Sequence, residues 1–338
     1  MELDAREWRL VRRPQGVPSE DDFELARVRL QPPGAGEVLI VNDWVSVDPG
    51  ARSRMDETGS YTTGLALGAP VTGRAVGRVE YSGDPRVREG ATVHHFGGWR
   101  DRLVLNAGEL EVLDVSAAPA QDWLDELGVP GFTAWLAVVE LGRVNPGEVL
   151  YVSSAAGAVG SVAGQVARLV GAGRVLGSAG SEDKVRWLTD DLGFDAAFDY
   201  HHTGIAEALA QLAADGVDVV VDLVGGETFA EAFTRLRRGG RLISVGNTSG
   251  YNAERTPVGI DTHRLVTDRL RVQGFTVLEY EALRPRFVEQ MTGWLAAGQL
   301  RTTKTVFDGL ESVPTAFRAL FDGSTRGKAL VKIGPADA

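Results

Sequence analysis

An apolar strand, a glycine turn and a helix follow one another between Val149 and Ala167, and this succession constrains the fold more than any other feature. The apolar run Glu148–Ser153 leads into Ser154-Ala-Ala-Gly-Ala-Val-Gly, after which small and apolar residues continue at helical spacing. From about Val129 onward, further short apolar runs alternate with helical patterns. This alternating pattern predicts βαβ units that build a buried parallel sheet.

The expected elements fall into two groups. In the α/β part, we expect the further strands Arg174–Ser178, Val217–Leu223, Arg241–Val245 and Arg271–Thr276, and the helices Ser161–Val170, Glu182–Asp191 behind a Ser181 cap, Ile205–Ala214, Thr228–Leu236 and Leu283–Ala297. Before about residue 125, the strand patterns Phe23–Leu30, Val38–Val47, Val71–Glu80 and Thr92–Phe96 predict a β-rich domain; after Gly298, we expect a strand Thr305–Phe307, a helix Val313–Phe321 and a strand Ala329–Ile333. The predicted fold class is α/β, a doubly wound parallel sheet beside a β-rich domain that the tail rejoins.

Composition excludes several kinds of function. The chain has 338 residues, a formal net charge of −11 and no long basic run, which argues for two domains and against nucleic acid or an anionic membrane as partner. It contains no cysteine, so disulfides, thiolate zinc ligands, iron–sulfur clusters and a cysteine nucleophile are all excluded. The five histidines form the pairs His94/His95 and His201/His202 plus His263, a pattern that does not suggest a metal site. With no signal peptide or membrane-spanning pattern, we expect a cytoplasmic protein.

The glycine turn matches the pattern of dinucleotide-binding turns. Against G-x-G-x-x-G, the three positions are Ala155, Gly157 and Gly160. Gly157 lets the backbone approach a pyrophosphate, Gly160 lets the helix pack close to the strand, and the helix N-terminus offers free N–H groups to the anion. A tight turn without a ligand would show the same glycines, but the strand before the turn and the helix after it favour a nucleotide.

The end of the next strand indicates which dinucleotide is bound. NAD enzymes place an acidic residue about 20 residues after the glycine turn, against the ribose hydroxyl. Here the strand ends in neutral Ser178, Gly180 and Ser181, followed by Lys184. A lysine there favours the 2′-phosphate of NADPH, with Ser181 and the helix N-terminus as further donors. Ser181 would also cap the helix, and a solvated Lys184 is the alternative reading.

At this point the chain resembles the medium-chain dehydrogenase/reductase superfamily, and within it the zinc-free group of leukotriene 12-hydroxydehydrogenase/prostaglandin reductases and plant alkenal double-bond reductases. The resemblance covers nearly the whole chain. It is carried in order by Val45-Ser-Val-Asp-Pro with Arg52, Pro130-Gly-Phe-Thr-Ala, Ser154-Ala-Ala-Gly-Ala-Val-Gly-Ser-Val, Ala179-Gly-Ser-Glu-Asp-Lys-Val, Leu192-Gly-Phe-Asp-Ala-Ala-Phe-Asp-Tyr, Asp222-Leu-Val-Gly-Gly-Glu, Tyr251-Asn and Gly327-Lys.

The resemblance implies a GroES-like catalytic domain from residues 1–125 and 299–338, a Rossmann NADP-binding domain from residues 126–298, an active site in the cleft between them, and a homodimer. It also implies the roles of individual residues. Gly157, Ala158, Val159 and Gly160 would contact the pyrophosphate, Lys184 and Tyr200 the 2′-phosphate, and Thr133 with Phe275, Thr276 and Val277 the nicotinamide end; Ala155, Ser178, Gly180, Ser181, Gly225, Gly226 and Asn247 complete the cofactor set.

Two positions depart from the family pattern. Gly50 stands where the family has an aromatic residue after Asp-Pro, which implies an enlarged or reshaped substrate pocket, and Leu223 replaces an asparagine near the cofactor.

The implied activity is metal-free, NADPH-dependent reduction of the carbon–carbon double bond of an enone or enal. Hydride addition to the β-carbon places negative charge on the carbonyl oxygen, and a neutral donor must stabilise that charge. Tyr251, in a glycine-bounded loop after an expected strand, is the candidate donor and a substrate-pocket residue; a loop aromatic that only packs is the alternative. Three other functions remain open: a quinone oxidoreductase, a biosynthetic reductase of enones or iminium groups, and an NADPH-binding sensor without turnover.

Overall fold

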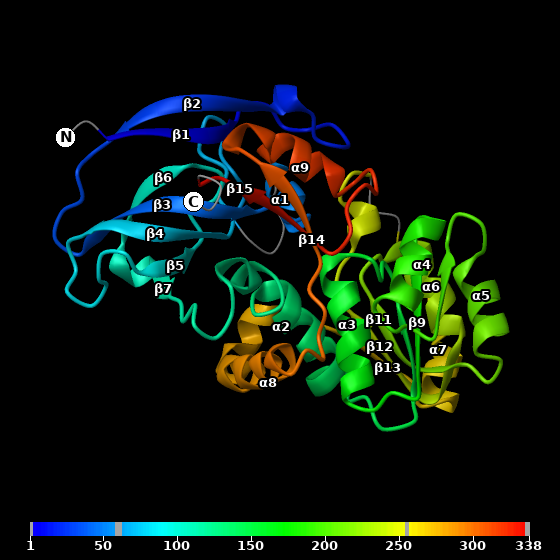
Figure 1. Ribbon diagram of the computed structural model, residues 1–338. Helices are drawn as coiled ribbons and strands as arrows, with labels where there is room; N and C mark the ends of the chain where they lie inside the picture. Colours follow the sequence, from blue (N-terminus) through cyan, green and yellow to red (C-terminus); the bar gives the residue numbers. More distant parts are fainter. Residues whose placement is uncertain (1–2, 58–62, 254–256, 335–338) are drawn as a thin grey trace. The chain divides into compact units, whose positions relative to one another are not determined.

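The computed structural model describes residues 3–57, 63–253 and 257–334, and it divides into two compact units. Unit 1 consists of Met1–Leu124 and Lys304–Ala338, and unit 2 consists of Asp125–Thr303. The chain therefore leaves unit 1 once, builds unit 2 from one continuous segment, and returns (Figure 1). Across the described residues, no helix combines the length and the apolar character that crossing a membrane requires.

Unit 2 is built on a six-stranded sheet of order β10-β9-β8-β11-β12-β13, in which every neighbouring pair is parallel. The chain order runs outward from the centre in both directions, so β8 and β11 meet where the succession reverses. The strands are β8 (Val149–Val152), β9 (Arg174–Ala179), β10 (Ala196–Asp199), β11 (Val217–Asp222), β12 (Leu236–Ser244) and β13 (Arg271–Gly274).

Helices cover both faces of this sheet (Figure 1). The face shared with α5 and α6 holds a buried cluster in which Tyr151 and Leu176 of the sheet meet Leu209 of α5 and Phe233 of α6. The helices are α2 (Val129–Trp135), which continues as a π-helical turn Leu136–Leu141, α3 (Ala158–Leu169), α4 (Glu182–Asp190), α5 (Ile205–Leu212), α6 (Gly226–Thr234), α7 (Thr262–Thr267) and α8 (Arg284–Ala296).

Unit 1 contains an antiparallel pair, β1 (Leu3–Leu10) with β2 (Phe23–Leu30), and a larger sheet of order β14-β15-β3-β4-β5-β7 in which β6 also pairs with β3. Its other elements are β3 (Glu37–Ser46), α1 (Gly50–Arg54), β4 (Ala75–Ser82), β5 (Thr92–His95), β6 (Arg102–Asn106), β7 (Leu110–Val112), β14 (Lys304–Asp308), α9 (Val313–Ala319) and β15 (Lys328–Lys332).

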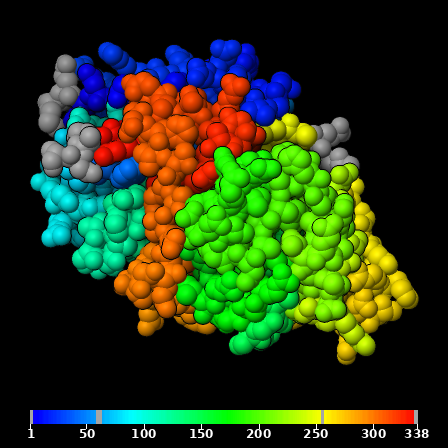
Figure 2. Space-filling view, turned by 45° about the vertical axis from the view of Figure 1, so that its right-hand side comes forward, coloured from blue at the N-terminus to red at the C-terminus, as the bar shows by residue number. Residues whose placement is uncertain are grey.

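The tail rejoins the N-terminal strands, as the sequence predicts. β15 pairs antiparallel with β3, and Phe317 of α9 packs edge-on against Trp99 and near Phe23. Trp8 Nε1 donates a hydrogen bond of 2.7 Å to the carbonyl oxygen of Leu310. Figure 2 shows α9 and its flanking segments (orange to red) on the surface below the N-terminal strands (blue).

The expected elements of the α/β part are confirmed, with three corrections. Helix α3 begins at Ala158 and not at Ser161, because the turn delivers the chain into helical geometry at once. Helix α6 ends at Thr234, since Leu236 already starts β12. Strand β12 begins at Leu236, before the predicted start at Arg241. Several elements are absent from the sequence prediction. In unit 2 these are α2, α7 and the short edge strand β10, whose residues are all half-buried, and in unit 1 they are β1, α1, β6 and β7.

A buried histidine holds the loop after β5. His95 is 2% exposed; its Nε2 lies 2.8 Å from Asn42 Oδ1, and its Nδ1 accepts a hydrogen bond of 2.9 Å from the Gly97 N–H. Burial, and then the charges of His94 and Arg100, lower the pKa of His95 to about 3. The ring is therefore neutral in the folded protein, with one nitrogen accepting and the other donating.

Because the pKa of His95 is lowered in the folded protein, we predict that the protein loses stability in mild acid. The folded pKa lies below the ordinary value, so between about pH 6.5 and pH 3 the unfolded chain binds a proton that the folded chain does not. The free energy of unfolding should fall by up to about 1.4 kcal/mol per pH unit from this group alone. Chemical denaturation at about pH 7 and pH 5 measures the fall, which should be smaller in His95→Gln. The exposed control His263→Gln should follow the wild type, and equal falls in all three proteins would rule out this role.

Candidate cofactor and active site

The predicted cofactor residues of unit 2 gather at one edge of the parallel sheet. Because all six strands run in the same direction, their carboxyl ends meet at a single edge, where doubly wound sheets bind ligands. The predicted residues that follow directly from these strand ends are Ala155, Gly157, Ala158, Val159 and Gly160 after β8, Ser178, Gly180, Ser181 and Lys184 at and after β9, Tyr200 after β10, Gly225 and Gly226 after β11, Asn247 and Tyr251 after β12, and Phe275, Thr276 and Val277 after β13.

The glycine turn after β8 has the geometry that an anion site needs. Gly157 is the N-cap of the twelve-residue helix α3 in extended conformation, and Ser154 before it has a φ of +48°. A Cβ at Gly160 would lie 2.5 Å from the Ser154 carbonyl oxygen, so only glycine fits there without moving the turn. A Cβ at Gly157 would meet nothing closer than 3.4 Å. The turn is thus packed tightly against Gly160, while the space at Gly157 is open for a pyrophosphate to approach.

Ser178 at the end of β9 is directed into the protein. It is 1% exposed, and its hydroxyl lies 2.8 Å from the Tyr151 hydroxyl. Burial, offset in part by this hydrogen bond, raises the pKa of Tyr151 above its ordinary value. The Ser178 carbonyl oxygen accepts a hydrogen bond from the Ala155 N–H. Ser178 therefore ties the glycine turn to β9 through its backbone, while its hydroxyl is already engaged.

The first turn of α4 and the end of β10 come together around Gly180. Ser181 caps α4, accepting a hydrogen bond of 3.3 Å from the Lys184 N–H, as predicted. A Cβ at Gly180 would lie 2.8 Å from the Tyr200 hydroxyl and 3.3 Å from His201 Nε2. Burial, and then the Asp199 charge, raise the pKa of Tyr200, so the phenol stays neutral and can donate to a phosphate.

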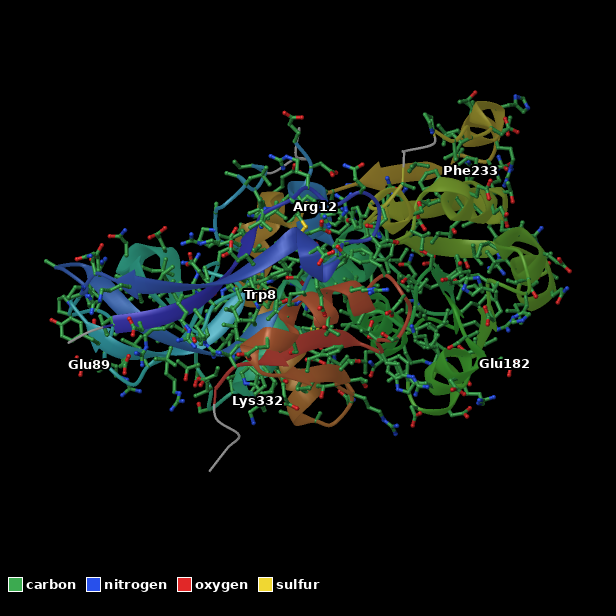
Figure 3. All side chains as sticks on the ribbon, turned by 90° about the horizontal axis from the view of Figure 1, so that it is seen from above. Trp8, Arg12, Glu89, Glu182, Phe233 and Lys332 are labelled. Atoms are coloured by element: carbon green, nitrogen blue, oxygen red, sulfur yellow. The ribbon has the colours of Figure 1, made fainter. Side chains whose placement is uncertain are left out.

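His201 lies beside Gly180 and Tyr200, although the sequence does not predict it as a site residue. Its ring centroid lies 4.4 Å from that of Tyr200, and the only signal for it in the sequence is its position directly after that tyrosine. Of the acidic residues in the first turn of α4, Glu182 is exposed at the surface (Figure 3).

A buried carboxylate, whose structural role the sequence motif around it does not predict, organises the loop after β11. Asp222 is fully buried; Ser153 Oγ and the Val224 N–H donate to one of its oxygens, at 2.7 and 3.3 Å, and the Gly225 N–H donates to the other at 2.9 Å. Burial, opposed by these donors, raises the pKa of Asp222. Ser153 Oγ in turn accepts from the Leu223 N–H at 2.8 Å. The pair Ser153 and Asp222 therefore joins the ends of the two central strands.

The loop that carries Tyr251 rests on this organised segment. The carbonyl oxygen of Leu223 accepts from the N–H of Thr248, and that of Val224 accepts from the N–H and hydroxyl of Ser249. Gly225 has a φ of +75°, and a Cβ there would lie 2.3 Å from Asn247 Oδ1. Tyr251 follows, half-buried, with its N–H donating to the Thr248 carbonyl oxygen at 3.3 Å. Leu223 thus holds the Tyr251 loop through backbone hydrogen bonds, which do not depend on the identity of its side chain.

The remaining predicted residues occupy separate places. Phe275, Thr276 and Val277 form the turn between β13 and a 3-10 segment, all half-buried. Thr133 lies within α2 and is 9% exposed; no hydrogen bond joins its side chain to the other described loops. Gly50 opens α1 in unit 1, and a Cβ there would meet no atom within 4 Å. Nothing in its surroundings requires a glycine at position 50. Among the described residues, no group of three or more His, Asp and Glu side chains could hold a metal ion.

The fold and this edge define a dinucleotide-binding oxidoreductase architecture, and comparison with known sequences agrees. Residues 6–113 match the family described as the N-terminal domain of oxidoreductase, and residues 158–295 match the family described as zinc-binding dehydrogenase. The chain is 36% identical to the 2-alkenal reductase (NADP(+)-dependent) of Nicotiana tabacum, over 94% of each chain. It is 33% identical to the NADPH-dependent curcumin reductase of Escherichia coli strain K12, over 98% of each chain.

Among solved structures, CurA from Vibrio vulnificus in complex with NADPH superposes with a TM-score of 0.92 at 33% identity, over 98% of this chain and 100% of that one. The chain therefore belongs to the medium-chain dehydrogenase/reductase superfamily, in the zinc-free group of alkenal, curcumin and prostaglandin reductases.

Proposed function

We propose that this protein is an NADPH-dependent reductase of carbon–carbon double bonds conjugated to a ketone or aldehyde. The observation that carries the proposal is the carboxyl edge of the unit 2 sheet, where an open glycine turn follows β8, a neutral strand end with Lys184 follows β9, and the Tyr251 loop follows β12. The names of the two relatives, a 2-alkenal reductase (NADP(+)-dependent) from tobacco and an NADPH-dependent curcumin reductase from Escherichia coli, and the NADPH-bound Vibrio structure support the proposal.

The cofactor residues fit a phosphorylated dinucleotide. The N–H groups of the first turn of α3, at Ala158 and Val159, would hold the pyrophosphate over Gly157, and the turn leaves room there for close approach. Lys184 with the neutral Tyr200 phenol would hold the 2′-phosphate, and the backbone at Phe275–Val277 would hold the nicotinamide end. When bound, NADPH supplies the hydride that the β-carbon of the substrate accepts.

Tyr251 would act on the other end of the conjugated system. As the β-carbon gains the hydride, negative charge moves to the carbonyl oxygen, and the Tyr251 hydroxyl would donate a hydrogen bond to it. The Ser153–Asp222 pair and the loop bonded to it would hold the Tyr251 backbone in place. The α-carbon then takes a proton, which restores the carbonyl group and completes a saturated ketone or aldehyde.

Comparing substrate classes tests the reaction. Cofactor oxidation should be fast with enones and enals and slow with simple quinones, and it should leave the carbonyl group intact. Preferential turnover of quinones would indicate the quinone oxidoreductase alternative. NADPH binding without oxidation by any of these compounds would indicate a sensor. Turnover confined to large enones would favour a biosynthetic role, for which the open space at Gly50 is the structural argument.

Lys184 is predicted to set the preference for the phosphorylated cofactor. Lys184→Ala should raise the KM for NADPH by about tenfold or more and leave the KM for NADH within about twofold, because only the former carries the 2′-phosphate. Arg186→Ala is the matched control, since Arg186 lies on the same helix, is exposed, and pairs with Asp183 and Glu182. Steady-state kinetics with both cofactors decides the point, and equal increases for both would remove Lys184 from this role.

We also infer a homodimer, formed through the open edge of β13. β13 ends the sheet of unit 2, all four of its residues are exposed, and Val272, Val266 and Leu278 present large apolar side chains there or nearby. An exposed strand edge of this kind readily pairs with a second copy. Light scattering of the purified protein should give twice the mass of the chain, and Val272→Lys should shift it toward the monomer; a monomeric wild type would refute this inference.

A further inference from the structure

An exposed histidine and the tyrosine before it present two polar atoms over one glycine of unit 2. Tyr200 and His201 follow β10 directly, and their ring centroids lie 4.4 Å apart at an interplanar angle of 49°. A Cβ placed on Gly180, after β9, would lie 2.8 Å from the Tyr200 hydroxyl oxygen and 3.3 Å from His201 Nε2. Both atoms therefore face the same small space over the Gly180 backbone, which a side chain at this residue would fill.

The turn that carries both rings is held by hydrogen bonds of its own backbone. Asp199 ends β10; its carboxylate accepts a hydrogen bond of 2.9 Å from the His201 N–H, and its carbonyl oxygen accepts one of 3.1 Å from the His202 N–H. The Tyr200 N–H donates to the Ala179 carbonyl oxygen at 3.2 Å, which ties the turn to the end of β9. The backbone from which the two rings project is therefore fixed before any ligand binds.

The two polar atoms are available to a ligand. Tyr200 is 47% exposed, and His201 is exposed as well. In the part of the chain that the structure describes, no hydrogen bond reaches the Tyr200 hydroxyl group or the ring nitrogens of His201. The Asp199 carboxylate is largely buried, and its second oxygen lies 3.4 Å from His202 Nδ1. Two donors beside an open glycine suit a ligand that carries several acceptor oxygens.

We propose that His201 is a further ligand of the 2′-phosphate of NADPH, acting with Tyr200, and that it contributes to the preference for the phosphorylated cofactor. In doubly wound folds, the end of the second strand, here β9, lies against the adenosine ribose. A phosphomonoester presents three acceptor oxygens, so the His201 Nε2–H group and the Tyr200 hydroxyl can each donate to a different one. An unphosphorylated ribose offers a single hydroxyl group in their place. The inference rests on the cofactor part of the proposed function and does not depend on the substrate.

A pair of cofactor fragments tests the role of His201 without catalysis. Adenosine 2′,5′-bisphosphate and adenosine 5′-monophosphate differ only in the 2′-phosphate, and calorimetric titration of the full-length protein measures the affinity for each. His201→Ala should weaken binding of the bisphosphate about tenfold, as expected for the loss of one hydrogen bond to a charged group, and change binding of the monophosphate by less than about twofold. His201→Gln should recover most of the affinity, because its amide keeps an N–H donor of similar reach.

A second variant tests the space over Gly180. In Gly180→Ala the new Cβ would lie 2.8 Å from the Tyr200 hydroxyl oxygen, so the tip of the tyrosine must move aside. We expect Gly180→Ala to weaken the bisphosphate about tenfold and to leave the monophosphate unaffected. Thermal unfolding should give the wild-type Tm for Gly180→Ala and for His201→Ala, since both changes lie at the exposed tips of side chains.

His202→Ala is the matched control, because His202 is the exposed neighbour whose ring lies beside Asp199. It should bind both fragments as the wild type does. In steady-state kinetics with an enone, His201→Ala should raise the KM for NADPH about tenfold and leave kcat and the KM for NADH unchanged. If no enone is reduced but the fragments show the expected difference, the proposed reaction fails and the role of His201 stands. Equal losses for the two fragments, no loss in His201→Ala, or the same loss in His202→Ala overturns that role.

Discussion

Replacing Tyr251 with phenylalanine is expected to lower the turnover of enones by about 100-fold and to leave the affinity for NADPH nearly unchanged. The substitution removes one neutral donor aimed at a charge that develops only during the reaction, and loss of such a donor costs on the order of 3 kcal/mol. The ring remains to fill its half-buried place in the loop after β12, so the cofactor loops bonded to Leu223 and Val224 should not move. Single-turnover kinetics at saturating cofactor, with fluorescence titration of NADPH, separates the two effects.

Tyr81 provides the matched control for this substitution. It lies on β4 in unit 1, is 46% exposed, and contributes no group to the predicted site. Tyr81→Phe should retain wild-type turnover. A Tyr251→Phe protein as fast as Tyr81→Phe would remove Tyr251 from the mechanism and leave the carbonyl oxygen to another donor.

Replacing each of the two glycines of the turn after β8 with alanine should have a different effect: one substitution should lower the stability of the protein, and the other should weaken NADPH binding. In Gly160→Ala the new Cβ would lie 2.5 Å from the Ser154 carbonyl oxygen and 2.8 Å from the Ala155 Cα, so the turn must shift and the protein should lose about 1–3 kcal/mol of stability. In Gly157→Ala the Cβ meets nothing closer than 3.4 Å, so folding should be unaffected. If the pyrophosphate binds over Gly157 as proposed, the methyl group would stand in its way, and NADPH affinity should fall by about 100-fold.

Thermal unfolding without cofactor and titration with NADPH measure the two effects in the same pair of proteins. We expect a lower Tm for Gly160→Ala only, and weaker NADPH binding for both variants. If Gly157→Ala binds NADPH as tightly as the wild type, the pyrophosphate does not lie over Gly157. If Gly160→Ala keeps the wild-type Tm, the close packing of α3 on the turn is not a constraint on the fold.

Local pattern was sufficient for most of the α/β part. The alternation of apolar runs with helical spacing predicts β8, β9, β11 and their helices to within a few residues, because strands buried on both faces leave an uninterrupted apolar signature. The Ser181 cap and the glycine turn followed from chemistry that acts within four residues. The same reasoning missed β10. This short edge strand has only half-buried residues, so its sequence lacks the run of apolar side chains that marks a buried strand.

Long-range hydrogen bonding could not be predicted. Asp222 was part of a recognised motif, but its role as acceptor for Ser153 and two loop N–H groups depends on strands 69 residues apart becoming neighbours. For the same reason, Ser178 is predicted as a cofactor residue from its position at the end of β9, whereas only the assembled sheet shows that its hydroxyl is directed toward that of Tyr151. The roles of Ser178, Thr133 and the other predicted cofactor residues remain predictions.

Tracing the hydride of the cofactor to its place in the product tests the proposed reaction most directly. The protein is supplied with 4-phenylbut-3-en-2-one and NADPH that carries deuterium at the transferred position of the nicotinamide, and the product is examined by NMR. We expect 4-phenylbutan-2-one with deuterium on the β-carbon and a solvent-derived proton on the α-carbon. An allylic alcohol with deuterium on the former carbonyl carbon would contradict the proposed reaction.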